Sequence, residues 1–261
     1  MTERQVTYLF IDGAYLRQAH DEAMHSVFGV PGDLAIERVH DHAQAFRTYY
    51  YDCEEVLKPG ESEADFSART KPQAEFFSRV QSLKAVHLQL GSLKGRRRRQ
   101  KEVDILLAVD MLTHGFNRNM SRAVLVAGDL DFRPVVEALV RGGVFVEVWY
   151  DKNSRAAELP LAADFGAEIS WHTLYKYNTE AFCESHKPPR HLQGGAEELP
   201  ILNVLARGSF EGGPAKIVDY PSRYSKILSV ELTSGVLWFE HSDEKVLKGY
   251  FARLYGPVEW T

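Results

Sequence analysis

The sequence predicts an α/β fold, a mostly parallel sheet flanked by helices, with a small β-rich accessory domain after it. Strand-like and helix-like segments alternate from the N-terminus onward, which is typical of βαβ units. The strand-like segments include continuously apolar runs, as expected when helices cover both faces of a sheet. The length of 261 residues is enough for one sizeable core and a smaller second unit.

A local sequence pattern predicts each strand and helix of the first domain. Apolar and β-branched runs predict strands at residues 6–12, 45–52, 85–91, 123–129 and 144–151, with an edge strand in 167–172. Helices are expected from Gly13 onward, at 72–83 with Pro72 in the first turn, at 101–115 closed by Gly115, at 132–143 and at 154–165. This order predicts a domain over residues 1–176.

The composition changes after residue 176. Residues 177–199 combine a proline pair, a glycine pair and charges without periodicity, so we expect a linker there. Residues 200–261 hold strand-like pieces around a Thr-Ser-Gly turn and then a short helix-like piece. This pattern predicts a small accessory domain of unknown function.

Composition excludes several classes of protein. The 44% hydrophobic and 26% charged residues are ordinary for a soluble domain, and no run is apolar enough for a membrane helix. Cys53 and Cys183 lack the spacing of a zinc site or a disulfide framework, and the first residues do not resemble a signal peptide. We therefore expect a cytoplasmic protein. The net charge of -5 argues against nucleic-acid binding over the whole surface, but not against a local basic patch.

Four aspartates are expected at one edge of the sheet. Sites in parallel α/β sheets form outside the carboxyl ends of the strands. Asp12 ends the first strand, Asp129 and Asp131 follow the fourth, and Asp104 lies in the first turn of a helix that begins near Lys101. If the first and fourth strands are neighbours, these carboxylates converge from three distant parts of the chain.

A divalent cation is the favoured explanation for such a cluster. Neighbouring carboxylates make one another harder to ionise, whereas Mg²⁺ or Mn²⁺ coordinates oxygen ligands. Bound singly or as a pair, such a metal polarises a scissile phosphate and generates hydroxide. The structural alternative is that Asp131 caps the following helix and Asp104 interacts with a helix dipole. The combination of four favours the metal.

Other titratable residues of this region are expected to lie outside the metal site. Asp110 follows Asp104 by six residues and so lies about 240° around the helix from it, which predicts a supporting or structural role. His20, Asp21 and His25 lie on or after the first helix, and we expect them to be solvated.

A basic run directly precedes the helix that carries Asp104. It contains Lys94, Arg96, Arg97, Arg98, Arg99 and Lys101. Such a run is usually a solvated surface loop. Next to the acidic site, however, it could hold a phosphate backbone while the scissile phosphate reaches the metal. The sequence thus favours a nucleic acid as the partner.

Three motifs together resemble the NYN domain of the PIN-like nuclease superfamily. They are "FIDGAYL", "KEVDILLAVDML" and "VLVAGDLDFRPVVEALVRGGVFVEV", within residues 5–172. The resemblance implies a Rossmann-like sheet and metal-dependent RNA cleavage. It places Asp12, Asp104, Asp129 and Asp131 as the ligands of Mg²⁺ or Mn²⁺.

Two positions depart from the family pattern. Tyr15 stands where the first motif commonly has Asn, and Ala127 stands where the last motif commonly has Ser. These changes leave open a catalytically silent RNA-binding or regulatory protein with the same fold. A haloacid-dehalogenase-like phosphatase is disfavoured because "DLDFR" follows the fourth strand and has Arg133 at the Thr/Val position. No GxGxxG motif suggests dinucleotide binding. A homodimer is possible.

Overall fold

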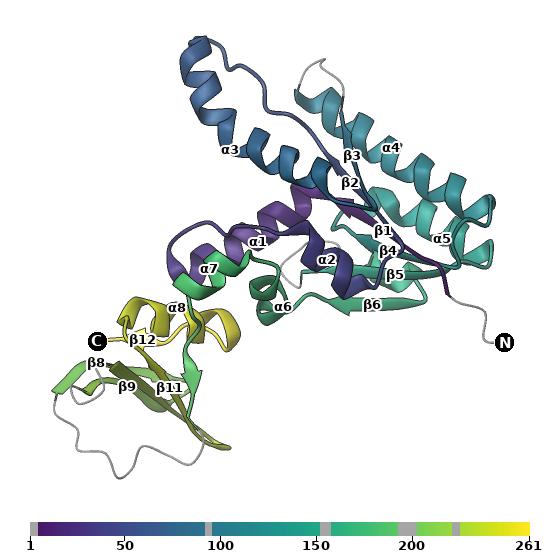
Figure 1. The fold of residues 1–261 in the computed structure, drawn as a ribbon. Coiled ribbons are helices and arrows are strands. Elements are labelled where there is room, and N and C mark those ends of the chain that lie inside the picture. Colours follow the sequence, from purple (N-terminus) through teal and green to yellow (C-terminus); the bar gives the residue numbers. More distant parts are fainter. Residues whose placement is uncertain (1–4, 92–95, 152–157, 193–202, 221–224) are drawn as a thin grey trace. The chain divides into compact units, whose positions relative to one another are not determined.

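The computed structural model describes residues 5–91, 96–151, 158–192, 203–220 and 225–261, with the backbone alone described at 96–101 and 220. The chain forms two compact units (Figure 1). The first unit contains Met1–Ala19 and Leu34–Thr173, and the second contains His20–Asp33 and Leu174–Thr261. Helix α1 (Gly13–Phe28) contributes to both. No helix in the described part of the chain is long and apolar enough to cross a membrane.

The first unit is a six-stranded parallel sheet, which confirms the predicted fold class. Its strands lie in the order β3-β2-β1-β4-β5-β6. Their bounds are Thr7–Asp12 for β1, Arg47–Asp52 for β2, Val86–Leu90 for β3, Arg122–Val126 for β4, Phe145–Tyr150 for β5 and Phe165–Glu168 for β6. The order reverses between β1 and β4, so the chain leaves these two neighbouring strands in opposite directions along the sheet.

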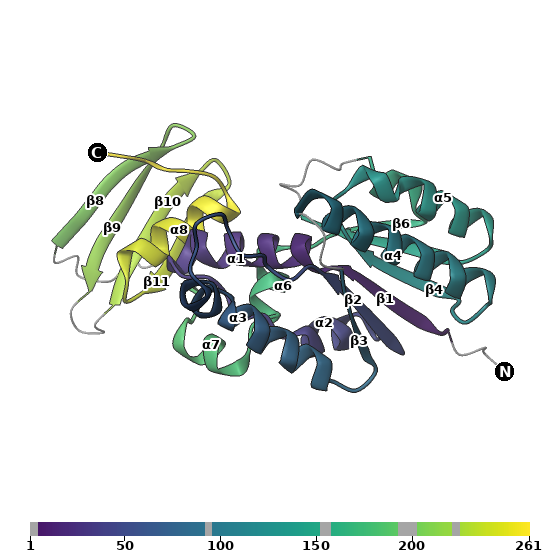
Figure 2. The ribbon, with the colours of Figure 1, turned by 90° about the horizontal axis from the view of Figure 1, so that it is seen from above.

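Helices cover both faces of this sheet (Figure 2). Helices α4 (Arg96–Phe116) and α5 (Arg133–Arg141) pack on one face, where Phe10 and Leu125 meet Leu107 and Leu139 in the main core. On the other side lie α2 (Ile36–Ala43) and α3 (Glu63–Ser82). Phe76 of α3 packs edge-on against Tyr50 of β2, with their ring centroids 5.7 Å apart.

Several element bounds differ from the sequence prediction. Pro72 lies inside α3 rather than in its first turn, because Ser62 caps the helix ten residues earlier by accepting a hydrogen bond from the Asp65 amide. Helix α2 was not expected. Of the helix predicted at 154–165, residues 154–157 lie outside the described residues, and Pro160–Ala162 form only a 3-10 turn. Helix α6 (Trp171–Lys176) begins inside the segment predicted as the edge strand.

The second unit contains a six-stranded antiparallel sheet in the order β12-β8-β9-β10-β11-β7. Its strands are Arg190–His191 (β7), Asn203–Phe210 (β8), Gly213–Tyr220 (β9), Ser225–Leu232 (β10), Gly235–His241 (β11) and Glu259–Trp260 (β12). Helix α8 (Glu244–Leu254) covers one face through Phe251, which contacts Phe210 and Phe239. Helix α7 (Glu180–Ser185) and strand β7 lie within the segment expected to be a linker.

Candidate active site

The candidate site lies where the order of the parallel sheet reverses. Strand β1 is hydrogen-bonded to both β2 and β4, and all three run in the same direction. The sequence analysis required β1 and β4 to be neighbours, and the pairing of Ile11 with Val126 shows that they are. Asp12 ends β1, and Asp129 follows β4 by three residues. Both therefore stand at the carboxyl edge of the sheet, where ligands bind in folds of this kind.

Asp12 and Asp129 each cap the start of a helical turn with one carboxylate oxygen. The Oδ1 atom of Asp12 accepts a hydrogen bond of 3.0 Å from the Tyr15 amide at the start of α1. The Oδ1 atom of Asp129 accepts one of 2.9 Å from the Asp131 amide in the 3-10 turn Leu130–Phe132. Within the described residues, no hydrogen bond engages either Oδ2 atom. Capping and metal binding are therefore compatible, because each role needs a different oxygen.

The other two aspartates occupy positions that differ from those expected. Helix α4 begins at Arg96, so Asp104 lies more than two turns into it, and the helix dipole does not explain this carboxylate. Asp131 lies inside the 3-10 turn and does not cap α5, whose first turn carries no side-chain cap. Asp131 and Asp129 are exposed, whereas Asp12 and Asp104 are half-buried.

The four carboxylates are close enough to disturb one another's ionisation. Burial, with repulsion from Asp104, Asp52 and Asp129, raises the pKa of Asp12 from 3.8 to about 7. Burial, with repulsion from Asp129 and Asp131, raises the pKa of Asp104 from 3.8 to about 6. Negative charge thus accumulates from β1, α4 and the turn after β4.

A hard divalent cation fits the chemistry of these donors. Carboxylate oxygens are its preferred ligands, and its charge would offset the repulsion between them. As positioned in the described residues, no three His, Cys, Asp or Glu side chains already form a set that could hold a metal ion. The fit therefore rests on the type and charge of the donors, and binding would draw the carboxylates closer together.

There is a direct steric reason why position 128, just before Asp129, is a glycine. A Cβ atom built on Gly128 would lie 2.2 Å from Cε2 of Tyr15, far inside van der Waals contact. The Tyr15 ring is held there because its hydroxyl accepts a hydrogen bond of 2.7 Å from the Asp151 amide. Tyr15, in the first turn of α1, thus connects this helix to the segments that follow β4 and β5.

Sequence reasoning missed a buried ion pair beside the site. Asp52 ends β2, is 2% exposed, and accepts hydrogen bonds of 2.8 and 2.9 Å from the guanidinium of Arg17 on α1. Its carboxylate also accepts hydrogen bonds from the Tyr50 hydroxyl and the Cys53 amide. Asp151, directly after β5, is likewise buried. Both aspartates end an apolar strand as Asp12 does, and that signal could have found them.

The contacts of Asp110 and His20 point to structural roles for both side chains. Asp110 accepts a hydrogen bond of 2.7 Å from the hydroxyl of Tyr51, which agrees with the structural role expected for it. Asp21 and His25 are exposed as expected, but His20 is completely buried, contrary to the prediction. The pattern of α1 did not show this, because the ring of His20 packs against Gly32, which lies outside the helix: a Cβ atom built on Gly32 would lie 2.1 Å from Cε1 of the ring.

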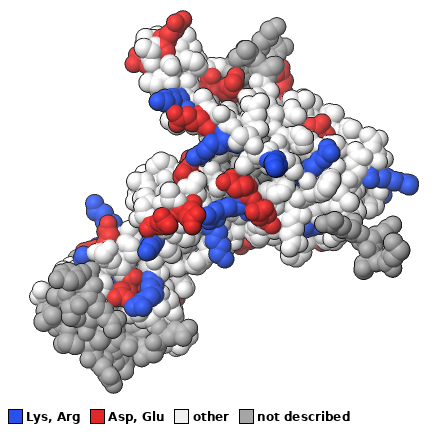
Figure 3. Space-filling model, viewed as in Figure 1, with Lys and Arg blue, Asp and Glu red and all other residues white. Residues whose placement is uncertain are grey.

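The basic run is only partly described. Lys94 lies outside the described residues, and the backbone of residues 96–101 forms the first turns of α4, with no side chains described. The contacts of Arg96, Arg97, Arg98, Arg99 and Lys101 therefore stay predictions. On the face of the molecule shown in Figure 3, described acidic and basic side chains are interspersed rather than gathered into one patch of a single sign.

Comparison with known proteins gives one family and one structure. The family model described as "NYN domain" matches residues 6–168. A crystal structure of a protein of unknown function from Vibrio parahaemolyticus is 16% identical, with 65% of this chain and 96% of that chain covered and a TM-score of 0.46. None of the curated proteins matches the chain.

Proposed function

Because the chain belongs to the NYN domain family, whose members are generally nuclease-like, we propose that it is a metal-dependent endoribonuclease. The observation that carries the proposal is that carboxylates from β1, from α4 and from the turn after β4 come together at the reversal of the sheet, where burial and then their mutual repulsion raise the pKa of Asp12 and Asp104. Such an accumulation of negative charge is costly to a fold, and a metal site explains it. RNA phosphodiester bonds are the proposed substrate.

The ligands proposed for Mg²⁺ or Mn²⁺ are Asp12, Asp104, Asp129 and Asp131. When bound, the cation polarises the scissile phosphate and lowers the pKa of an attacking water. The protein's part is to restrain two of these carboxylates through one oxygen each. Backbone amides hold Oδ1 of Asp12 and Oδ1 of Asp129, and in the described part of the chain the second oxygen of each has no hydrogen bond, so it is the oxygen proposed to coordinate the cation.

The basic run is proposed to bind the phosphates on either side of the cleaved bond. The four arginines and Lys101 precede Asp104 on the same helix, so the backbone of α4 links this part of the basic run to the acidic site. Replacing Arg96, Arg97, Arg98 and Arg99 by Ala should weaken RNA binding and flatten its salt dependence. An unchanged salt slope would contradict this assignment.

A catalytically silent RNA-binding protein is the second candidate. Tyr15 favours it, because its ring and hydroxyl are engaged with Gly128 and the Asp151 amide and do not supply the amide group of the usual Asn. All four aspartates are present, which favours the nuclease.

One experiment separates the two candidates. End-labelled single-stranded RNA, hairpin RNA and DNA are incubated with the wild-type chain in Mg²⁺, Mn²⁺ or EDTA, beside Asp12→Asn and the control Asp41→Asn. Asp41 is exposed on α2 and lies outside the proposed site. We expect metal-dependent shortening of RNA by the wild type and the control, and none by Asp12→Asn. Intact RNA that is nevertheless retarded on a gel would favour the silent binder. A light-scattering mass measurement tests the homodimer.

A further inference from the structure

One face of the antiparallel sheet carries a row of four side chains from four adjacent strands. Arg207 of β8 pairs with Lys216 of β9, Lys216 with Ser229 of β10, and Ser229 with Trp238 of β11. Residues paired directly across strands project from the same face. Strands lie about 4.8 Å apart, so the row spans roughly 14 Å.

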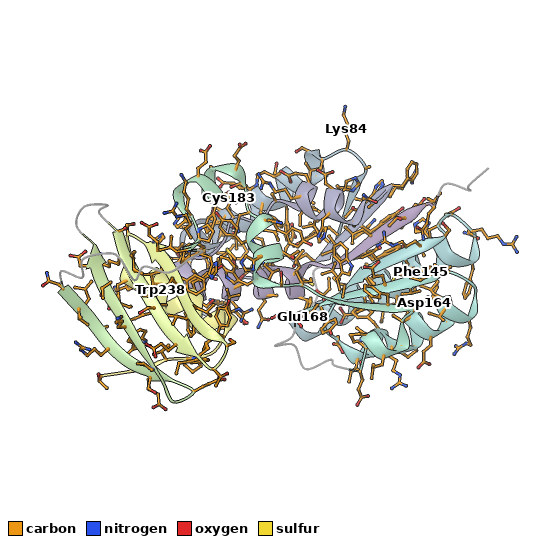
Figure 4. All side chains as sticks on the ribbon, turned by 90° about the horizontal axis from the view of Figure 1, so that it is seen from below. Lys84, Phe145, Asp164, Glu168, Cys183 and Trp238 are labelled. Atoms are coloured by element: carbon orange, nitrogen blue, oxygen red, sulfur yellow. The ribbon has the colours of Figure 1, made fainter. Side chains whose placement is uncertain are left out.

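This row lies on the face opposite helix α8. Phe239, next to Trp238 along β11, contacts Phe251 of α8, with a centroid distance of 6.3 Å. Phe210 of β8 also contacts Phe251, at 5.1 Å. Because successive side chains of a strand alternate between faces, Trp238 points away from the helix. Figure 4 shows Trp238 on this sheet.

The two cations of the row, Arg207 and Lys216, lie directly opposite each other on neighbouring strands. Arg207 is exposed and Lys216 half-buried, and like charges directly opposite each other destabilise a sheet. Within the described residues, neither forms an ion pair. Glu240, on the same face, is engaged instead with Arg190 and the Ser225 hydroxyl. An anionic partner would relieve the repulsion between Arg207 and Lys216.

Trp238 is held in place at the other end of the row. It packs against the buried Val218 and Ile227 and remains partly exposed. No hydrogen bond in the described part of the chain engages its indole N–H. A partly exposed aromatic ring that packs on one side against the sheet is a platform on which a nucleobase can stack.

We propose that this face binds single-stranded RNA, with backbone phosphates on Arg207 and Lys216 and a base stacked on Trp238. Cations that follow the backbone, next to an aromatic platform, are how single strands are bound without sequence preference. An acidic protein would use the two cations but would gain little from the ring. The site lies in the second unit, outside the residues that match the NYN family, and does not require cleavage.

The first test measures binding of fluorescent U12 RNA to the full chain in EDTA, which removes metal-dependent cleavage from the result. Arg207→Gln/Lys216→Gln is compared with Lys176→Gln/Lys245→Gln, which removes the same charge at exposed positions on α6 and α8. We expect the first pair to bind about tenfold more weakly, with a salt slope smaller in magnitude by about 1.4, and the control pair to bind as wild type. Equal loss in both pairs would overturn the proposal.

Substitutions of Trp238 and of the nearby Glu231 test the same face, and they should change the affinity for RNA in opposite directions. Trp238→Leu keeps an apolar side chain against Val218 and should weaken binding about fivefold to a hundredfold, whereas Trp238→Phe should retain most of it. Glu231 is exposed and lies two residues from Ser229 along β10, so Glu231→Gln should strengthen binding. Equal affinities of the Leu and Phe variants would refute stacking.

A photocross-linking experiment locates the RNA directly. RNA containing 5-iodouridine is irradiated with the full chain, and the adducts are mapped by mass spectrometry. We expect an adduct at Trp238. Adducts confined to residues 6–168, or binding of polyglutamate as tight as that of U12, would overturn the proposal. Lost RNA cleavage in the Asp12→Asn variant with this adduct retained would support both sites separately.

Discussion

The steric fit between Gly128 and Tyr15 gives a quantitative prediction. In Gly128→Ala the new methyl group would lie 2.2 Å from Cε2 of Tyr15, where an ordinary contact begins at 3.4 Å. The backbone of Gly128 is not left-handed, so space alone opposes the substitution. The ring must move by about 1 Å, against the hydrogen bond that Asp151 donates to its hydroxyl. We expect the free energy of unfolding to fall by about 1–3 kcal/mol.

A double-mutant cycle tests whether the Tyr15 ring is the cause of the stability lost in Gly128→Ala. Urea unfolding in EDTA, followed by circular dichroism, is measured for Gly128→Ala, Tyr15→Ala and the double variant. With the ring removed, the methyl group has room, so Gly128→Ala should cost less than about 0.5 kcal/mol in the Tyr15→Ala background. A cost that is equal in both backgrounds would show that Gly128 is required for a reason other than the ring.

Three further predictions follow from buried charges and polar groups. The pKa of Asp12 is raised to about 7, so between about pH 4 and 7 the folded chain holds a proton that the unfolded chain releases. The free energy of unfolding of the metal-free protein should therefore fall by up to about 4 kcal/mol as the pH rises from about 4 through 7. In urea titrations, Asp12→Asn should reduce that fall. Arg17→Met leaves the carboxylate of Asp52 buried without its cation and should cost about 3–5 kcal/mol, whereas a cost below about 1 kcal/mol would contradict the ion pair's role. Neither ring nitrogen of His20 has a hydrogen-bond partner within the described residues, so His20→Leu should raise the melting temperature, and a lowered one would refute this reasoning.

Much of the parallel unit could be predicted because its signals are local. An apolar run ending in Asp12, and another leading to Gly128 and Asp129, mark strand ends whatever their neighbours are. Helix starts were predicted less well. The cap at Ser62 competes with the preference of Pro72 for a first turn, and the cap prevailed because α3 tolerates an internal proline.

The candidate site, too, could be predicted only in part from the sequence. The sequence identified four aspartates by their positions after strands and near a helix start, and the resemblance grouped them. It did not identify Arg17 or Asp52, because their hydrogen bonds join residues 35 positions apart and no periodicity marks such a pair. Nor did it predict the paired cations of the C-terminal sheet, since only the strand register places Arg207 opposite Lys216.

The sequence by itself determined which segments become strands and which residues end them, since periodicity and capping act over a few residues. Only the tertiary structure decided that β1 lies beside β4, which brings the repelling carboxylates of Asp12 and Asp129 to the same edge. It also decided that the ring of Tyr15 fills the space above Gly128. The physical reason is that strand order and side-chain packing depend on contacts between distant residues, whose energies no local pattern contains.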